Sequence, residues 1–143
     1  MDQTIYVIDA NVILEMTLAQ ERADESIAFF NWITDEDIPV VITAFSLYAS
    51  EIIATARRAY ENLEKFLKKM KEINGLTIYH TAIDEEIEIA KLAHTTNLDF
   101  DDALQYFVAK KLDATLVSFD SHFDNTDLKR VEPRDVLPAI SSQ

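Results

Sequence analysis

The sequence predicts an α/β fold, a three-layer α/β/α sandwich whose central parallel sheet has four to five strands. Short apolar runs alternate with longer stretches whose apolar residues recur at helical spacing. Strands separated by helices pair in parallel and need helices on both faces. The chain has one glycine in 143 residues and no cysteine. This excludes glycine-rich phosphate-binding loops, disulfides and thiolate metal sites.

The elements follow one another along the chain in the order that such a sheet requires. The apolar run 5–8 predicts the first strand, and helical spacing predicts a first clear helix over 22–33. The β-branched run 40–43 predicts the second strand. Helical patterns follow over 45–60 and 61–73, the latter ended by Asn74 and Gly75.

The second half of the chain repeats this alternation. A strand is predicted at 77–80, helices at 83–94 and 100–112, a strand at 115–119 and a weaker one near 128–131. Without any linker, residues 1–138 are expected to form one domain and residues 139–143 a frayed tail.

Charge and hydropathy restrict the class of protein. The 26 acidic residues outnumber the 13 lysines and arginines, which gives a net charge of −13. Taken alone, this charge argues against nucleic-acid binding, because phosphate-binding surfaces are basic. The sequence shows neither a signal peptide nor a membrane-spanning run, so we expect a cytoplasmic protein without membrane contact.

Acidic residues stand where the predicted strands end. Asp9 follows the first strand and Asp120 ends the apolar segment "TLVSFD". Glu51 lies in the helix after the second strand, and Asp101 and Asp102 lie in the first turn of the helix before the 115–119 strand. Ligands of parallel α/β sheets bind outside the carboxyl ends of the strands. We therefore expect acids from four separate segments to meet at one edge.

Each of these acids also has an ordinary structural explanation. Asp9 is a candidate helix N-cap, in competition with Asn11. Glu51 falls at the margin of a predicted apolar helix face and could be a flanking charge. Asp101 and Asp102 favour a helix start electrostatically. They flank the inward face of their helix on opposite sides, so only one is expected to point at the strand ends, and Asp99 is the expected N-cap.

Clustered carboxylates repel one another, and a cation should hold them together. A zinc site is disfavoured because the chain lacks cysteine and has only three histidines. All-oxygen ligands suit Mg²⁺ or Mn²⁺, which activate water and neutralise charge on phosphates. The residues thus point to metal-dependent phosphodiester hydrolysis.

Three stretches together resemble the PIN domain, and more narrowly the VapC-type toxins and related single-domain members of archaeal type. They are "DANVIL" from Asp9, the acid Glu51, and "DALQYFVAKKLDATLVSFDSHF" from Asp102. The resemblance implies a ribonuclease that uses Mg²⁺ or Mn²⁺ to cut RNA and is the toxin of a toxin–antitoxin pair. It implies that the catalytic and metal-binding residues are Asp9, Glu51, Asp102 and Asp120, supported by Asn11 and Ser118.

The resemblance also implies partners. Family members are often homodimers, and toxin members are neutralised by an antitoxin whose tail occupies the acidic site. The helical segment "SIAFFNWI" is a candidate dimer or antitoxin surface, or it packs inside the protein. His122 in "SHF" has no assigned role. Basic residues at 57–58, 65–71 and 110–111 are either solvated or available to RNA.

Four alternatives remain. One is a non-enzymatic PIN-like module that binds RNA or a partner, and another is an RNA-processing nuclease without an antitoxin. A receiver-type phosphoacceptor ranks low, since it would need an acid pair after the first strand. A haloacid-dehalogenase-like phosphatase would need a second Asp where Asn11 stands.

Overall fold

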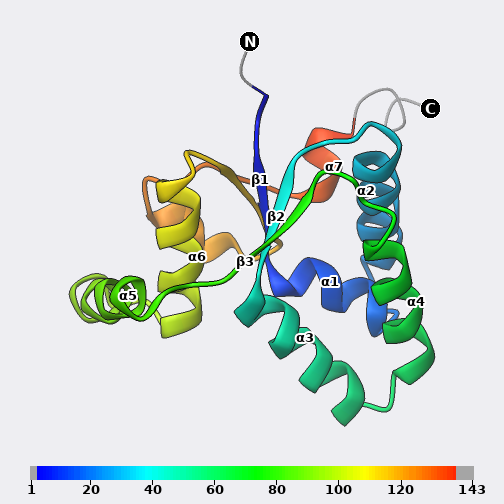
Figure 1. The fold of residues 1–143 in the computed structure, drawn as a ribbon, viewed down its shortest axis with the longest axis horizontal. Coiled ribbons are helices and arrows are strands. Elements are labelled where there is room, and N and C mark those ends of the chain that lie inside the picture. Colours follow the sequence, from blue (N-terminus) through cyan, green and yellow to red (C-terminus); the bar gives the residue numbers. More distant parts are fainter. Residues whose placement is uncertain (1–2, 138–143) are drawn as a thin grey trace.

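The computed structural model describes residues 3–137 and confirms the predicted α/β fold (Figure 1). Five parallel strands form one sheet in the order β3-β2-β1-β4-β5. Their bounds are β1 Tyr6–Ile8, β2 Val40–Thr43, β3 Leu76–Tyr79, β4 Thr115–Val117 and β5 Arg130–Val131. The frayed tail predicted at 139–143 lies outside the described residues.

Seven α-helices and one 3₁₀ turn accompany the strands within residues 3–137. They are α1 Ala10–Thr17, α2 Ala23–Asp35, α3 Ala44–Ala56, α4 Tyr60–Met70, α5 Ile83–Thr96, α6 Phe100–Lys111, the turn η1 Ser121–Asn125, and α7 Pro133–Val136. Helix α1 is absent from the sequence-based prediction. Helix α3 ends four residues earlier than predicted, because Arg58 adopts a positive φ of 60° and breaks the pattern. None of these helices has the length and apolar composition needed to cross a membrane.

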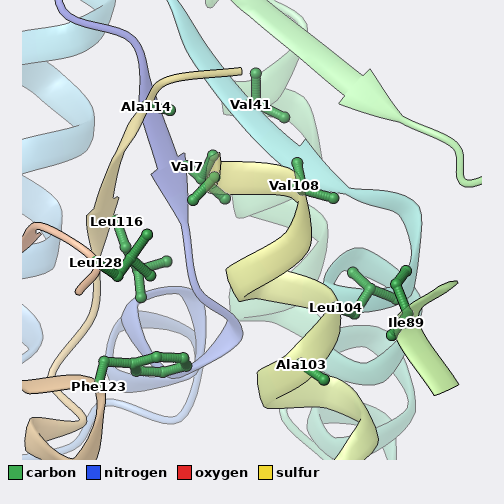
Figure 2. Packing of buried hydrophobic residues seen from close by; sticks show 11 residues of the cluster. Val7, Val41, Ile89, Ala103, Leu104, Val108, Ala114, Leu116, Phe123 and Leu128 are labelled. Atoms are coloured by element: carbon green, nitrogen blue, oxygen red, sulfur yellow. The ribbon is translucent and has the colours of Figure 1, made fainter. Parts of the chain in front are cut away.

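The helices pack on both faces of the sheet (Figure 1). Successive residues of a strand point to opposite faces, and in β1 Val7 belongs to one core cluster while Ile8 belongs to the other. The first cluster joins β1 and β4 to α6: Val7 lies beside the end of α6 that carries Val108, Leu116 lies beside Leu128, and Leu104 lies beside Ile89 (Figure 2). The second gathers α1, α2 and α4 on the other face.

The aromatic residues of α2 belong to this second cluster. Phe29, Phe30 and Ile33 are fully buried, and Phe30 meets Phe66 of α4 edge to face at 5.4 Å between ring centroids. Of the apolar residues in this segment, Ile27 is exposed. The "SIAFFNWI" segment therefore packs mainly inside the protein, and it does not offer the broad apolar surface that a dimer or antitoxin interface requires.

Strand pairing brings the ends of β1 and β4 together. Ile8 is paired with Val117, and the backbone amide of Asp9 donates to the carbonyl of Val117 at 2.9 Å. Asp9 and Ser118 thus leave the sheet side by side. This pairing places two distant segments of the chain at one point of the carboxyl edge.

The single glycine lies where β2 and β3 come together. A Cβ added to Gly75 would lie 2.2 Å from the carbonyl oxygen of Ile38, and the Gly75 carbonyl accepts a hydrogen bond from the amide of Val40. Gly75→Ala is therefore expected to lower the free energy of unfolding by about 1–3 kcal/mol through overpacking. Thermal unfolding checks this, with the exposed Thr77→Ala of the same strand as control. Equal melting temperatures for the two variants would contradict it.

Candidate functional site

A cavity of about 230 Å³ opens at the carboxyl edge of the sheet, between α1, α3 and α6. Four carboxylates line it, those of Asp9, Asp101, Asp102 and Asp120. The remaining lining residues are Ala10, Asn11, Leu14, Phe45, Ser46, Ala49, Ile53 and Gln105. Among the described residues that line this cavity there is no lysine, arginine or histidine, although the imidazole of His122, which is not in the lining, contacts Asp102 and Asp120.

Asp9 is both the N-cap of α1 and a wall of this cavity. Its Oδ1 accepts a hydrogen bond from the amide of Ala10 at 2.7 Å, which explains why an acid ends the first strand. Burial raises the pKa of Asp9 to about 6, the Ser118 and Ala10 hydrogen bonds oppose that rise, and the charges of Asp120 and Asp101 add to it. The capping and functional explanations of Asp9 are therefore compatible.

Asn11 and Ser118 connect the two strand ends. The Ser118 hydroxyl donates to Asp9 Oδ2 at 2.8 Å and accepts from Asn11 Nδ2 at 3.1 Å and from the amide of Asp120 at 3.0 Å. Asn11 Oδ1 accepts from the amide of Phe119 at 3.1 Å. This network fixes the Asp9 carboxylate relative to the backbone that carries Asp120.

Helix α6 contributes Asp101 and Asp102 to the cavity lining. Asp99 is its N-cap residue, although its side chain makes no capping hydrogen bond. Burial raises the pKa of Asp102 to about 6, and the Asp101 carboxylate raises it further, while His122 acts in the opposite direction. Asp101 and Asp102 both line the cavity, but Asp102 is the less exposed of the two. The structure therefore brings both acids of the pair to the site.

His122 is a member of the site to which the sequence assigned no role. Its Nδ1 lies 2.6 Å from Asp120 Oδ1, and its Nε2 lies 3.2 Å from Asp102 Oδ2. The signal for it was its position two residues after Asp120. At that distance a tight turn returns the side chain to the acid, and Asp120 caps this turn, η1, by accepting from the His122 amide at 3.0 Å.

Glu51 is the predicted catalytic acid that does not line the cavity. Ala49 stands on the cavity side of α3, together with Ser46 and Ile53, and Glu51 lies about 200° further round the helix from Ala49. The predicted apolar face of α3 is largely exposed, and the small residues Ser46, Ser50 and Ala54 are the buried ones. Because the face that packs inward is the opposite one, Glu51 points away from the other acids.

The donors present suit a hard divalent cation. One ligand atom from each of Asp102, Asp120 and His122 lies within 4.8 Å of the other two, and Asp99, Asp101 and Asp102 form a second such group. Asp9 lies across the cavity from α6 and adds a further carboxylate. Two carboxylates of the lining, Asp9 and Asp102, have pKa values raised mainly by burial, and a bound cation would favour their charged forms.

Comparison with known proteins matches the chain to one family. The PIN domain model matches residues 6–129. No functionally curated sequence matches the chain. Solved structures match it with sequence identities of 15–16%, at which the likeness concerns the fold.

Three of these structures cover nearly the whole chain. The toxin VapC20 of Mycobacterium tuberculosis, which cleaves the sarcin–ricin loop, has a TM-score of 0.71 at 15% identity over 90% of this chain and 99% of its own. VapBC2 of Rickettsia felis, bound to a DNA fragment from its promoter, has 0.66 at 16% identity over 90% and 98%. PAE2754 of Pyrobaculum aerophilum has 0.66 at 15% identity over 99% and 100%.

Proposed function

This chain belongs to the PIN domain family, and from that premise we propose that it is a metal-dependent endoribonuclease and the toxin of a toxin–antitoxin pair. The observation that carries the proposal is the convergence of Asp9, Asp102 and Asp120, from three distant segments, around one cavity without cationic side chains in its described lining. VapC20, a toxin that cleaves the sarcin–ricin loop, shares the fold. In this proposal the protein acts as a nuclease in the cytoplasm.

In this proposal Asp9, Asp102 and Asp120 hold one or two Mg²⁺ or Mn²⁺ ions, with Asp101 at the rim. Such an ion supplies an activated water and neutralises charge on the phosphate. The chain's own residues set the geometry: Ser118 and Asn11 orient the Asp9 carboxylate. The N-terminus of α1 stabilises the negative charge of Asp9. Glu51 is left out of this set because it does not reach the cavity.

The test is RNA cleavage by the whole chain with Mn²⁺, with Mg²⁺ and with a chelator, on single-stranded RNA, tRNA and ribosomal RNA fragments. Cutting that requires metal and stops on chelation is the expected result. Absence of cutting on every RNA, with no effect of metal on the melting temperature, would overturn it.

A second candidate has one observation in its favour. Ala49, and not Glu51, stands on the cavity side of α3, so the site holds fewer acids than the sequence predicted. A non-enzymatic PIN-like module that binds RNA or a partner would tolerate this. Such a module would bind RNA or its partner without hydrolysing RNA, and Asp9→Asn would leave this binding unchanged.

In this proposal, two unpaired arginines at the end of α3 contact the RNA backbone. Arg57 and Arg58 follow α3 and are exposed, and neither forms an ion pair within residues 3–137. Lys110, by contrast, is held by Asp127 at 3.0 Å. Changing both arginines to serine should weaken RNA binding. It should also reduce the slope of the logarithm of the binding constant against the logarithm of the salt concentration by about 1.4, at roughly 0.7 per phosphate contact. Binding is measured in chelator, and Lys110→Ser is the control expected to stay unchanged; equal slopes for wild type and the arginine variant would contradict the prediction.

The partners in this proposal are an antitoxin protein and a second copy of the chain. Helix α3 exposes Phe45, Tyr48, Ile52 and Ile53 on one side, a contiguous apolar surface of the kind that marks an interface. The homodimer is proposed through this surface. Ile52→Glu is expected to yield a monomer by light scattering, with Glu51→Gln, next to it in the chain, as the control that keeps the dimer. A wild-type monomer at high concentration would exclude it.

A further inference from the structure

His122 is held in a defined position beside two carboxylates. It lies in η1, where Asp120 Oδ1 accepts from the His122 amide at 3.0 Å and lies 2.6 Å from the imidazole Nδ1. The ring also stacks on Phe123, with ring centroids 6.1 Å apart and 18° between the planes. Phe123 is fully buried, so the turn anchors the imidazole to the core even though the ring itself is exposed.

The two ring nitrogens have different partners. Nδ1 lies 2.6 Å from Asp120 Oδ1, the oxygen that also accepts the hydrogen bond of the His122 amide. Nε2 lies 3.2 Å from Asp102 Oδ2 in hydrogen-bonding geometry, so this nitrogen is directed at the second carboxylate. Nε2 can meet that carboxylate either through a shared proton or through a shared metal ion.

Resting on the proposed function, we infer that His122 is a nitrogen ligand of the divalent ion, with Nε2 joining carboxylate oxygens of Asp102 and Asp120. One ligand atom from each of these residues lies within 4.8 Å of the other two. Adjacent ligands of an octahedral ion bound at 2.0–2.2 Å lie roughly 3 Å apart, close to the 3.2 Å between Nε2 and Asp102 Oδ2.

The second nitrogen supports the same assignment. Metal-binding histidines nearly always donate their other N–H to a carboxylate or carbonyl, which fixes the tautomer and the ring orientation. The Asp120 carboxylate, whose Oδ1 lies 2.6 Å from Nδ1, is the group placed to take this part.

A nitrogen ligand changes which ion the site prefers. Carboxylate oxygens suit Mg²⁺ and Mn²⁺ alike, whereas imidazole favours transition metals. The chain should therefore bind Mn²⁺ more tightly than Mg²⁺, and the difference should depend on His122. The other two histidines offer matched controls, since neither His80 nor His94 belongs to either potential metal-binding group of the described residues.

The test uses Mn²⁺ as the probe and needs no RNA. Mn²⁺ bound to the whole chain is examined by pulsed electron paramagnetic resonance, which detects a directly bound ¹⁴N, and affinities are obtained by titration. We expect a nitrogen coupling in wild type and in His94→Ala, and its loss in His122→Ala. Mn²⁺ affinity should fall roughly tenfold or more in His122→Ala, while Mg²⁺ affinity changes less than about threefold.

The failures of the two proposals are distinguishable. Mn²⁺ binding that is lost in Asp120→Asn but shows no nitrogen coupling, with His122→Ala binding as tightly as wild type, overturns the ligand and leaves the acidic metal centre intact. Tighter binding by His122→Ala would mean that the protonated ring competes with the metal, which also overturns the ligand. Absence of Mn²⁺ binding by wild type overturns both. His122→Gln, checked by circular dichroism, repeats the test should alanine disturb η1.

Discussion

Asp9→Asn is expected to reduce RNA cleavage by at least about 10³-fold, the loss that several kcal/mol of transition-state stabilisation represents. The asparagine keeps the shape of the side chain and its acceptor for the Ala10 amide, but it removes one carboxylate from the cavity. The folded protein should be as stable as wild type or more stable at neutral pH, because burial disfavours the charged carboxylate there. Initial cleavage rates and thermal unfolding of both proteins check the two parts.

Glu51→Gln is the matched control for this experiment. It makes the same carboxylate-to-amide change on α3, outside the cavity, and is expected to keep cleavage close to that of wild type, because no group of the cavity lining is changed. A large loss in Glu51→Gln would restore the four-acid set implied by the family resemblance. Full activity in Asp9→Asn would mean that the nuclease active site does not lie in this cavity.

The meeting of Asp9 and Asp120 could be predicted because it follows from topology. Both acids end apolar strands, and the carboxyl ends of parallel strands share one edge of a sheet. That β1 and β4 are direct neighbours, with Ile8 beside Val117, is a property of strand order, which alternating apolar runs do not encode. The sequence thus predicted that both acids lie at the carboxyl edge of the sheet, whereas the pairing of β1 with β4 determines how close they are to each other.

Glu51 shows where helical periodicity misleads. The wheel placed it correctly between Leu47 and Tyr48, but the larger apolar face was assumed to be the buried one. In α3 the buried face instead carries Ser46, Ser50 and Ala54. Hydrogen bonds satisfy the two hydroxyls: Ser50 donates to the carbonyl of Ser46, and Ser46 contacts Thr43 and Gln105. A buried polar face that is satisfied in this way has no signature in the sequence alone.

His122 and α1 were missed for a related reason, namely that both depend on local turns. Asp9 and Asp120 each cap the element that follows them, α1 and η1. A carboxylate that ends a strand can cap and bind at once, and the sequence-based reasoning treated those roles as alternatives. Once Asp120 caps η1, the position of His122 beside it follows from the turn.

Metal-free protein is expected to lose stability as pH rises from about 4 to about 7, opposite to the behaviour of salt-bridged carboxylates. Asp9 and Asp102 each have a pKa near 6 in the folded state, against an ordinary value of 3.8. Between these values the folded state binds more protons than the unfolded state, so raising the pH favours unfolding. For Asp9 the loss is on the order of 2–3 kcal/mol at neutral pH. Glu85 and Glu132, whose pKa values are lowered from 4.5, stabilise the fold as pH rises through that value, so they oppose the loss only in the lower part of this window.

With Mn²⁺ bound, stability should rise with pH instead of falling. The ion binds the deprotonated carboxylates, so it stabilises the fold most near neutral pH, where the metal-free protein is least stable. Melting temperatures at pH 5 and pH 7, with Mn²⁺ and with chelator, measure the effect. Asp9→Asn separates the site from general repulsion within a chain of net charge −13, since that repulsion persists in the variant while the contribution of Asp9 does not. If the melting temperature of Asp9→Asn changes with pH as much as that of wild type, the charge of the whole surface, and not the carboxylates of the cavity, sets the pH dependence. If it changes less with pH, and Mn²⁺ raises it less, both the pH-dependent loss of stability and the bound ion belong to the carboxylates at this edge of the sheet.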